Sequence, residues 1–396
     1  MDILISGMGI AGPTLAYWLR RAGHSPVVVE QASRLRRGGY IIDFWGLGYD
    51  IAERMGLIPR LNDVGYFIKE VRLVNERGAR AGGFSASVFQ RATDNRFVSL
   101  PRSELSAAIY DAIRNDVEVV WGDSISDIGV GGARAPVTFE SGRQREFDLL
   151  IGADGLHSNV RRLGFGEEKR FETYLNYKVA AFQADGYRPR DDDVYVAYTR
   201  PGRQVARFSM RDDLTLFLFV FHDDSSHMPP HDAPDEMKRR LRSLFGDMGW
   251  ECSQILDAMD ASDQLYFDRV SQIRMDDWSN GRLCLLGDAA AAPSLLAGEG
   301  AALAMIEAYV LAGELRGVGS DPAEALRRYE TRLRPFVVKK QKSAERFASS
   351  FAPKTEFGIA VRTIVTRAFD VPFVADLFLG STVRDDFVLP GYDFDA

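Results

Sequence analysis

A glycine-rich stretch near the start of the chain, Gly7–Gly12, constrains the fold more than any other feature. An apolar run over 3–6 precedes it and predicts a buried strand, and the helical spacing of apolar residues over 11–22 predicts a helix. Residues 26–30 then predict a second buried strand that ends at Glu30. A strand, glycine turn, helix and strand in this order are typical of a Rossmann-type unit that binds a dinucleotide.

Each glycine of the stretch has a separate physical role in such a unit. Gly7 permits a tight turn, Gly9 lets a pyrophosphate approach the backbone, and Gly12 lets the helix pack closely on the strand. The free N–H groups of the helix that begins at Ala11 would face the phosphates. Glu30 can accept hydrogen bonds from ribose hydroxyls, and its charge would repel a 2′-phosphate. The stretch predicts dinucleotide binding without separating FAD from NAD.

Composition excludes several classes of protein. Hydrophobic residues make up 46% of the chain and charged residues 27%, which indicates a compact globular protein. The net charge of −7 provides no basic field for nucleic acid or an anionic membrane. Two cysteines, Cys252 and Cys284, are too few for a disulfide framework or a metal cluster, so we expect a cytoplasmic protein without a metal site. No window has the roughly 18 uninterrupted apolar residues of a membrane span.

The middle of the chain has a different character and predicts a second lobe. Residues 194–198 and 214–221 are aromatic and β-rich, which is typical of an antiparallel sheet with one face exposed to water. Further helices are expected over 48–55 and 103–113, and further strands over 148–152 and 283–286. The tail from Pro322 predicts two helices, the first kinked or broken at Pro335.

The predicted fold class is therefore α/β, with a Rossmann-type domain interleaved with a smaller mixed or antiparallel sheet domain, followed by C-terminal helices. We expect the nucleotide-binding domain at 1–70, 98–168 and 276–325. The sheet domain, which would bind the substrate, is expected at 71–97 and 169–275. Helices within 326–396 are expected to brace both lobes.

Two later segments resemble motifs of a known family. The strand at 148–152 opens into Asp154-Gly155, and the strand at 283–286 opens into Gly287-Asp288. Together with Gly7–Gly12, and in this order and spacing, they resemble the class A flavoprotein monooxygenases, the family of para-hydroxybenzoate hydroxylase. The resemblance covers most of the first 330 residues. It implies FAD as the bound cofactor and NADH or NADPH as co-substrate.

The resemblance also implies roles for single residues. Asp288 is similar to the aspartate that holds an FAD ribityl hydroxyl, and Arg102 to the arginine near the flavin and pyrophosphate. Pro293, Gly298 and Gly300 resemble residues that position the catalytic face of the flavin, and no acid or base is assigned. The full set expected to bind the cofactor is Gly7, Gly9, Ala11, Gly12, Glu30, Arg37, Asp43, Arg102, Asp154, Gly155, Asp288, Pro293, Gly300 and Ala301.

Within the family, the enzymes that hydroxylate tetracycline-type antibiotics and other fused polyketides look most similar. Residues 181–185 resemble their substrate-lobe strand, which implies that Gln183 contacts the substrate and that Arg203 is the matching arginine. Two departures concern the flavin side. Ala291 stands where the family often has histidine, and Glu299 stands where it has glutamine.

The implied function is an FAD-dependent, NAD(P)H-consuming monooxygenase. Such an enzyme inserts one oxygen atom from O₂ into an aromatic or polyketide-like small molecule, through a flavin C4a-hydroperoxide. Two alternatives stay open: an FAD-dependent reductase of the geranylgeranyl-reductase kind, and a protein that binds FAD and sequesters a ligand without turnover. The sequence leaves open the substrate, the choice between hydroxylation, epoxidation and Baeyer–Villiger insertion, the choice of NADH or NADPH, and the oligomeric state.

Overall fold

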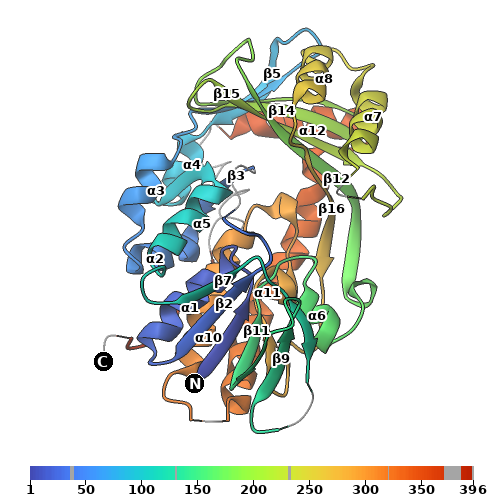
Figure 1. Cartoon of the computed structure of the whole chain (residues 1–396). Helices are drawn as coiled ribbons and strands as arrows, with labels where there is room; N and C mark the ends of the chain where they lie inside the picture. The colour runs from blue at the N-terminus through green and yellow to red at the C-terminus, as the bar shows by residue number, and fades with distance from the viewer. Residues whose placement is uncertain (36–39, 130–131, 231–232, 320, 370–384, 395–396) are drawn as a thin grey trace.

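The computed structural model describes the chain except residues 36–39, 130–131, 231–232, 320, 370–384 and 395–396, and except the side chains of 346–350. Two lobes lie one above the other in Figure 1, joined by long strands and by helices from the C-terminal part. The lower lobe holds a six-stranded sheet. In spatial order its strands are β17 (Ser279–Asn280), β18 (Leu283–Leu285), β11 (Leu149–Gly152), β1 (Asp2–Ser6), β2 (Ser25–Glu30) and β7 (Glu118–Trp121).

The inner strands of this sheet run parallel. β1 pairs in parallel with β2 on one side and with β11 on the other, and β11 pairs in parallel with β18. Their residues are almost continuously apolar and buried because both faces are covered. α1 (Ala11–Arg21) and α10 (Gly300–Leu315) cover one face. A small antiparallel sheet of β8 (Ile125–Ile128), β9 (Ala135–Phe139) and β10 (Gln144–Phe147) covers the other (Figure 1).

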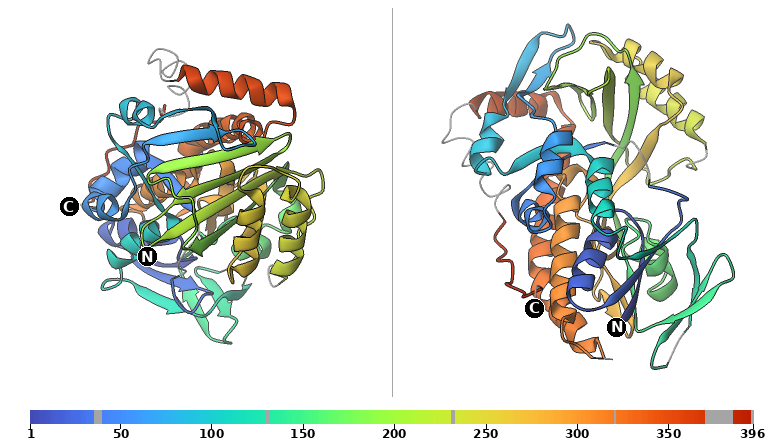
Figure 2. Two further views of the ribbon diagram at one scale, coloured as in Figure 1. Left: turned by 90° about the horizontal axis from the view of Figure 1, so that it is seen from above. Right: turned by 60° about the vertical axis from the view of Figure 1, so that its left-hand side comes forward.

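The helix α10 lies at the centre of the lower lobe. All residues from Leu303 to Leu315 are buried, so this helix is buried on every side rather than amphipathic, with Glu307 and Glu314 as its buried charged residues. Its neighbours are α1, α2 (Gly46–Arg54) and α11 (Ala323–Phe351), and the long α11 runs beside it (Figure 2). Its first residue, Gly300, is thereby fixed between the two lobes.

The upper lobe is built on a seven-stranded mixed sheet. Its order is β16 (Tyr266–Ile273), β12 (Glu172–Asp185), β15 (Leu214–His222), β14 (Arg203–Ser209), β13 (Val194–Arg200), β4 (Glu70–Val74) and β5 (Arg80–Ser85). Neighbouring strands are antiparallel except β13 and β4, which are parallel.

One face of this sheet, here called the outer face, is covered by two helices, α7 (Pro234–Phe245) and α8 (Cys252–Ala261). Buried aromatic side chains of β12 and β15 pack there against α7, whose Met237, Leu241 and Phe245 form an apolar stripe. The expectation of a sheet face exposed to water was therefore wrong. The residues of that face are apolar because helices cover them.

The opposite, inner face looks toward the lower lobe. Phe208 and Leu216 are buried there together with Tyr66, and Tyr40 and Ile41 pack against them. Ile41 begins β3 (Ile41–Trp45), which pairs with β6 (Phe97–Pro101). The connecting helices α3 (Ile58–Val64), α4 (Ser87–Ala92) and α5 (Arg102–Asp111) lie on the same side of the molecule (Figure 1).

Two helices follow residue 322, as predicted: α11 and α12 (Glu356–Ala368). Of the predicted kink or break at Pro335, the break is ruled out, because α11 continues through this residue. Pro335 and Thr331 both lie on the exposed side of α11. The carbonyl of Thr331, which loses its N–H partner at Pro335, therefore faces water, while Leu333 and Val337 on the other side keep the helix packed.

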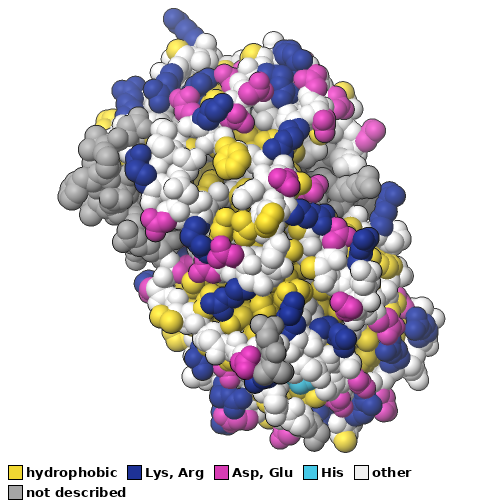
Figure 3. Space-filling view, turned by 90° about the vertical axis from the view of Figure 1, so that its left-hand side faces the viewer, with side chains coloured by type: hydrophobic (Ala, Val, Ile, Leu, Met, Phe, Trp, Pro, Cys, Tyr) yellow, Lys and Arg dark blue, Asp and Glu magenta, His cyan; other side chains and the backbone are white. Residues whose placement is uncertain are grey.

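Among the described residues, no helix combines the length and the apolar character that a bilayer span requires. On the face shown in Figure 3, basic and acidic side chains are interspersed over the surface. The described part of the chain also contains no group of three or more histidine, cysteine, aspartate or glutamate side chains arranged to hold a metal ion.

Candidate functional site

The three sequence motifs meet at one edge of the parallel sheet. Gly7 follows β1, Asp154 follows β11 and Gly287 follows β18, and these three strands are neighbours. A Cβ atom added to Gly7 would lie 2.5 Å from the carbonyl oxygen of Ala153. One added to Gly287 would lie 3.3 Å from the Cβ of Ala11. The carboxyl ends of the strands thus form one continuous rim, where open α/β sheets bind their ligands.

Two glycines of the loop differ in the space around them: a side chain would not fit at Gly12, whereas the backbone at Gly9 is open. A Cβ on Gly12 would lie 2.0 Å from the carbonyl oxygen of Gly7, which itself has a φ of +108°. At Gly9 the nearest described heavy atom to such a Cβ is Nη2 of Arg102, at 3.4 Å. The backbone at Gly9 is therefore accessible to a ligand, and the Arg102 guanidinium lies beside it.

Side chains from two other elements hold this loop. Glu30, at the end of β2, accepts hydrogen bonds from the backbone N–H of Met8 (2.8 Å) and of Ala32 (2.9 Å). Ser106 of α5 donates its O–H to the carbonyl of Gly9 at 2.9 Å. The carboxylate of Glu30 is thereby placed next to the turn.

The carboxylate of Asp154 forms hydrogen bonds within the turn that follows β11. Its carboxylate accepts the O–H of Ser158 at 2.5 Å and the N–H of Val160 at 3.0 Å, at the start of α6 (Asn159–Gly164). Burial raises the pKa of Asp154. Gly155 follows with a φ of +84°, a conformation that favours glycine. Both residues shape the turn at the rim.

Asp288 occupies the start of α9 (Asp288–Ala291), after Gly287 at a φ of +63°. A Cβ on Gly300 would lie 3.6 Å from Oδ1 of Asp288, so this carboxylate faces the beginning of α10. Burial raises the pKa of Asp288, and the positive charges of Arg102 and Arg161 oppose that rise. A carboxylate, a guanidinium and an open glycine backbone thus line the same part of the rim.

Two residues that support this rim were missed at the level of sequence. Arg161, fully buried, donates to the carbonyls of Leu156 (2.6 Å) and Ala289 (3.0 Å), and so ties the Asp154 turn to the Asp288 turn. Glu307, also fully buried, accepts the N–H of Gly287 at 2.6 Å. Burial raises the pKa of Glu307 to about 8. Arg161 belongs to no sequence pattern that signals burial, whereas Glu307 lies in the almost wholly apolar run of α10, which could have indicated it.

The loop that leads to Gly300 is held between the lobes by two glutamines. Gln272 donates to the carbonyl of Pro293 at 2.7 Å, and Gln341 donates to the carbonyl of Ala292 at 3.1 Å. The next residue, Ser294, has a φ of +139°. The loop then packs against the inner face of the upper sheet through Leu296.

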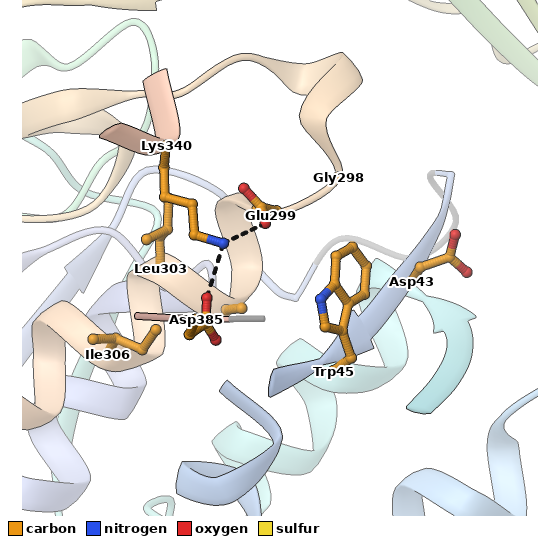
Figure 4. A pocket seen from close by; sticks show the side chains of 9 residues that line it. Asp43, Trp45, Gly298, Glu299, Leu303, Ile306, Lys340 and Asp385 are labelled. Carbon is orange, nitrogen blue, oxygen red and sulfur yellow. Dashed lines mark hydrogen bonds and ion pairs between the residues drawn. The ribbon is translucent and has the colours of Figure 1, made fainter. Parts of the chain in front are cut away.

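A pocket lies where this loop ends (Figure 4). Asp43 and Trp45 of β3 line it on one side, and Gly298 and Glu299 line it on the other. Asp43 accepts the O–H of Ser99, and burial raises the pKa of this aspartate. Gly300 and Ala301 follow as the first turn of α10. Of the expected flavin-side residues, Asp43 and Gly298 thus line one pocket, and Gly300 and Ala301 follow its lining residue Glu299 in the chain.

The structure does not bring the two expected substrate residues together. Gln183 alternates with Phe182, which faces α7 and α8, so Gln183 lies on the inner face. Arg203 lies on the outer face, where it donates to the carbonyl of Leu244 and, at 2.8 Å, to Asp247. Its expected substrate contact is not supported, because its guanidinium anchors α7. Arg37 lies outside the described residues.

Aromatic residues of the upper sheet divide in the same way. Tyr195 and Phe208 belong to the inner face. Phe182, Phe217 and Phe219 pack on the outer face instead. The inner face is therefore the one that can roof a ligand held on the rim below.

The residues present fit FAD. The open backbone at Gly9, beside the cation Arg102, suits a pyrophosphate, and the carboxylates of Glu30 and Asp288 suit ribose and ribityl hydroxyls. The apolar residues of the inner face, above the loop that ends at Gly298, suit an aromatic ring system.

Comparison with known proteins agrees with this geometry. Residues 1–343 match the family model described as FAD binding domain. A flavin-dependent monooxygenase from Legionella longbeachae is 33% identical over 358 residues, which cover 90% of this chain and 91% of the relative. An uncharacterized protein from Mycobacterium tuberculosis is 36% identical over 343 residues, 86% of this chain and 91% of that protein.

Among solved structures, the tetracycline destructase Tet(51) superposes with a TM-score of 0.82 and 30% identity, covering 99% of both chains. The resemblance drawn from the three motifs is thereby confirmed, as are the FAD-binding fold and the enzyme class. The chain belongs to the FAD-binding domain family and is one of its FAD-dependent monooxygenases.

Proposed function

We propose that the enzyme oxygenates a fused-ring aromatic or polyketide-like molecule in the cytoplasm, with NADH or NADPH as the reductant. The observation that carries this proposal is the placement of Gln183 on the inner face, paired with Leu216, which also pairs with Phe208. Such a wall suits a large flat ligand that needs one or a few directed hydrogen bonds. The similarity to a protein named tetracycline destructase supports the same substrate class.

We assign the cofactor contacts residue by residue. Glu30 would bind the adenosine ribose, Arg102 and the backbone at Gly9 the pyrophosphate, and Asp288 a ribityl hydroxyl. Pro293, Gly298 and Gly300 would lie along the ring system. Bound FAD supplies the redox and oxygen chemistry.

The remaining task of the protein is to position the substrate and exclude water. Tyr195, Phe208 and Leu216 supply an apolar roof, and Gln183 can orient the ligand through its amide. Excluding water matters because oxygen activated on a flavin is otherwise lost without product. Arg203 is left out of this assignment because it is engaged with Leu244 and Asp247.

The test begins with the absorption spectrum of the purified protein and NADPH oxidation in air with tetracycline as the probe. A product heavier by one oxygen atom, labelled when ¹⁸O₂ is supplied, supports the proposal. Substrate reduction without label would favour the reductase alternative. Tight tetracycline binding without turnover would favour ligand sequestration.

A pair of variants tests the proposed contact between Gln183, on the inner face, and the substrate. Gln183→Leu should raise KM about tenfold, because one directed hydrogen bond to the ligand is lost while FAD content is unchanged. Arg203→Lys, on the opposite face, is the matched control and should leave KM unchanged. Equal KM values in both variants would refute the assignment of Gln183.

A further inference from the structure

A buried cluster of three charges adjoins the pocket of Figure 4. Lys340 of α11 donates to Glu299 at 2.6 Å and to Asp385 at 2.8 Å. The side chains of all three residues are only 10–11% exposed. Charged groups are buried to this extent only when they are paired, because desolvation otherwise costs several kcal/mol per ion. The three side chains therefore form one unit.

This unit connects segments that are distant in the sequence. The second carboxylate oxygen of Asp385 accepts the N–H of Leu47 at 2.9 Å, at the start of α2. Glu299 precedes the first residue of α10, and Gly298 before it has a φ of +70°. The cluster thus fixes the end of the loop relative to α11, α2 and the C-terminal segment.

The charge of the cluster is not balanced. Two carboxylates face one ammonium, which gives a formal charge of −1 beside the pocket. Burial raises the pKa of Glu299, and Lys340 opposes that rise. The carboxyl of Asp43 lines the same pocket from β3. A negative charge here would act against the extra negative charge of a reduced flavin.

We propose that Lys340 is a positioning residue for the flavin, which pairs with Glu299 and fixes residues 298–300, so that the net charge of the Glu299–Lys340–Asp385 cluster sets the reduction potential of bound FAD. This inference rests on the proposed placement of the ring system beside Gly298. It assigns a purpose to the glutamate that replaces the glutamine of the family pattern.

The midpoint potential of bound FAD, measured by titration against a reference dye, tests this inference. Formal cluster charge is 0 in Glu299→Gln, −2 in Lys340→Met and −1 in the double variant, as in the wild type. We expect the potential to rise in Glu299→Gln, to fall in Lys340→Met, and to return close to the wild-type value in the double variant. Lys340→Arg should keep the wild-type potential.

FAD affinity gives a second readout. Lys340→Met should raise the Kd for FAD about tenfold, measured by flavin fluorescence, because two unpaired carboxylates loosen the loop. If the wild type, the two single charge variants and the double variant all have the same midpoint potential while FAD stays bound, the inference is wrong. Should Lys340→Met fail to fold, the near-isosteric Glu299→Gln decides alone, since an unchanged potential there overturns the inference. A wild-type protein that takes up no FAD would instead refute the proposed function.

Discussion

At the scale of single residues, Gly9 and Gly12 have different roles: Gly12 is needed for folding and Gly9 for ligand binding. A methyl group at Gly12 would lie 2.0 Å from a backbone oxygen, whereas one at Gly9 would meet only the flexible end of Arg102 at 3.4 Å among the described atoms. Gly12→Ala should therefore destabilise the apoprotein by about 1–3 kcal/mol, because the backbone must shift. Gly9→Ala should leave apoprotein stability unchanged and weaken FAD binding at least about tenfold.

Urea unfolding of the apoproteins and fluorescence titration with FAD measure these two effects. The assignment of the glycine loop fails if Gly9→Ala binds FAD as tightly as the wild type.

Glu307 makes stability depend on pH. Its pKa is about 8 in the folded protein and near the ordinary 4.5 in the unfolded chain, because only the folded protein buries it. Between these values the folded state holds a proton that the unfolded state has lost. The stabilisation is complete below pH 4.5 and is lost as the pH rises through 8, at up to about 1.4 kcal/mol per pH unit.

Glu307→Gln should remove this slope, so that free energies of unfolding measured across that range change less with pH than in the wild type. Glu324→Gln, an exposed position on α11, is the control and should retain the wild-type slope. If the free energy of unfolding of Glu307→Gln still falls with pH as in the wild type, other groups cause the pH dependence.

At the scale of elements, α11 shows that a proline need not end a helix. Because Pro335 and Thr331 face water, the helix retains the proline at the cost of one hydrogen bond. Pro335→Ala restores the missing N–H and should raise the free energy of unfolding by about 1–3 kcal/mol. Chemical denaturation of the two proteins measures the difference. A variant no more stable than the wild type would mean that the helix adapts to Pro335 without loss.

Elements with a local signal were predictable from the sequence. The strand, glycine turn and helix at the N-terminus follow from residues adjacent in the chain, and β1 and α1 lie where the pattern placed them. The covering of the outer face by α7 was not anticipated, although Met237, Leu241 and Phe245 have helical spacing. Alternation along one strand cannot tell whether a face meets water or a distant helix.

The same limit applies to the site. Motif residues at the rim could be named because the ends of parallel strands must meet there. The hydrogen-bond partners of Arg161 and Glu307 could not be named, since they are remote in sequence. The face on which Arg203 lies depends on the register of β14, which no local pattern determines.

At the scale of the whole molecule, the C-terminal helices link both lobes. Gln341 of α11 donates to the carbonyls of Ile273 and Ala292, the first in the upper sheet and the second in the loop of the lower lobe. Arg362 of α12 donates to Thr199 and Gln204 of the upper sheet. These contacts give the C-terminal part a structural role beyond the domain that binds the nucleotide.

Two truncations test that role in order. Ending the chain before Thr355 removes α12 and the segment that contributes Asp385. It should lower the free energy of unfolding by a few kcal/mol, since Thr199 and Gln204 lose their buried partner Arg362 and Lys340 loses Asp385. Ending it before Pro335 also removes Gln341 and exposes the apolar surface that Phe336 and Val337 cover, and should destabilise the protein further. Thermal and urea unfolding, each followed by circular dichroism, measure both steps. If the shorter chain unfolded at the same midpoint as the full chain, the two lobes would hold together without these helices.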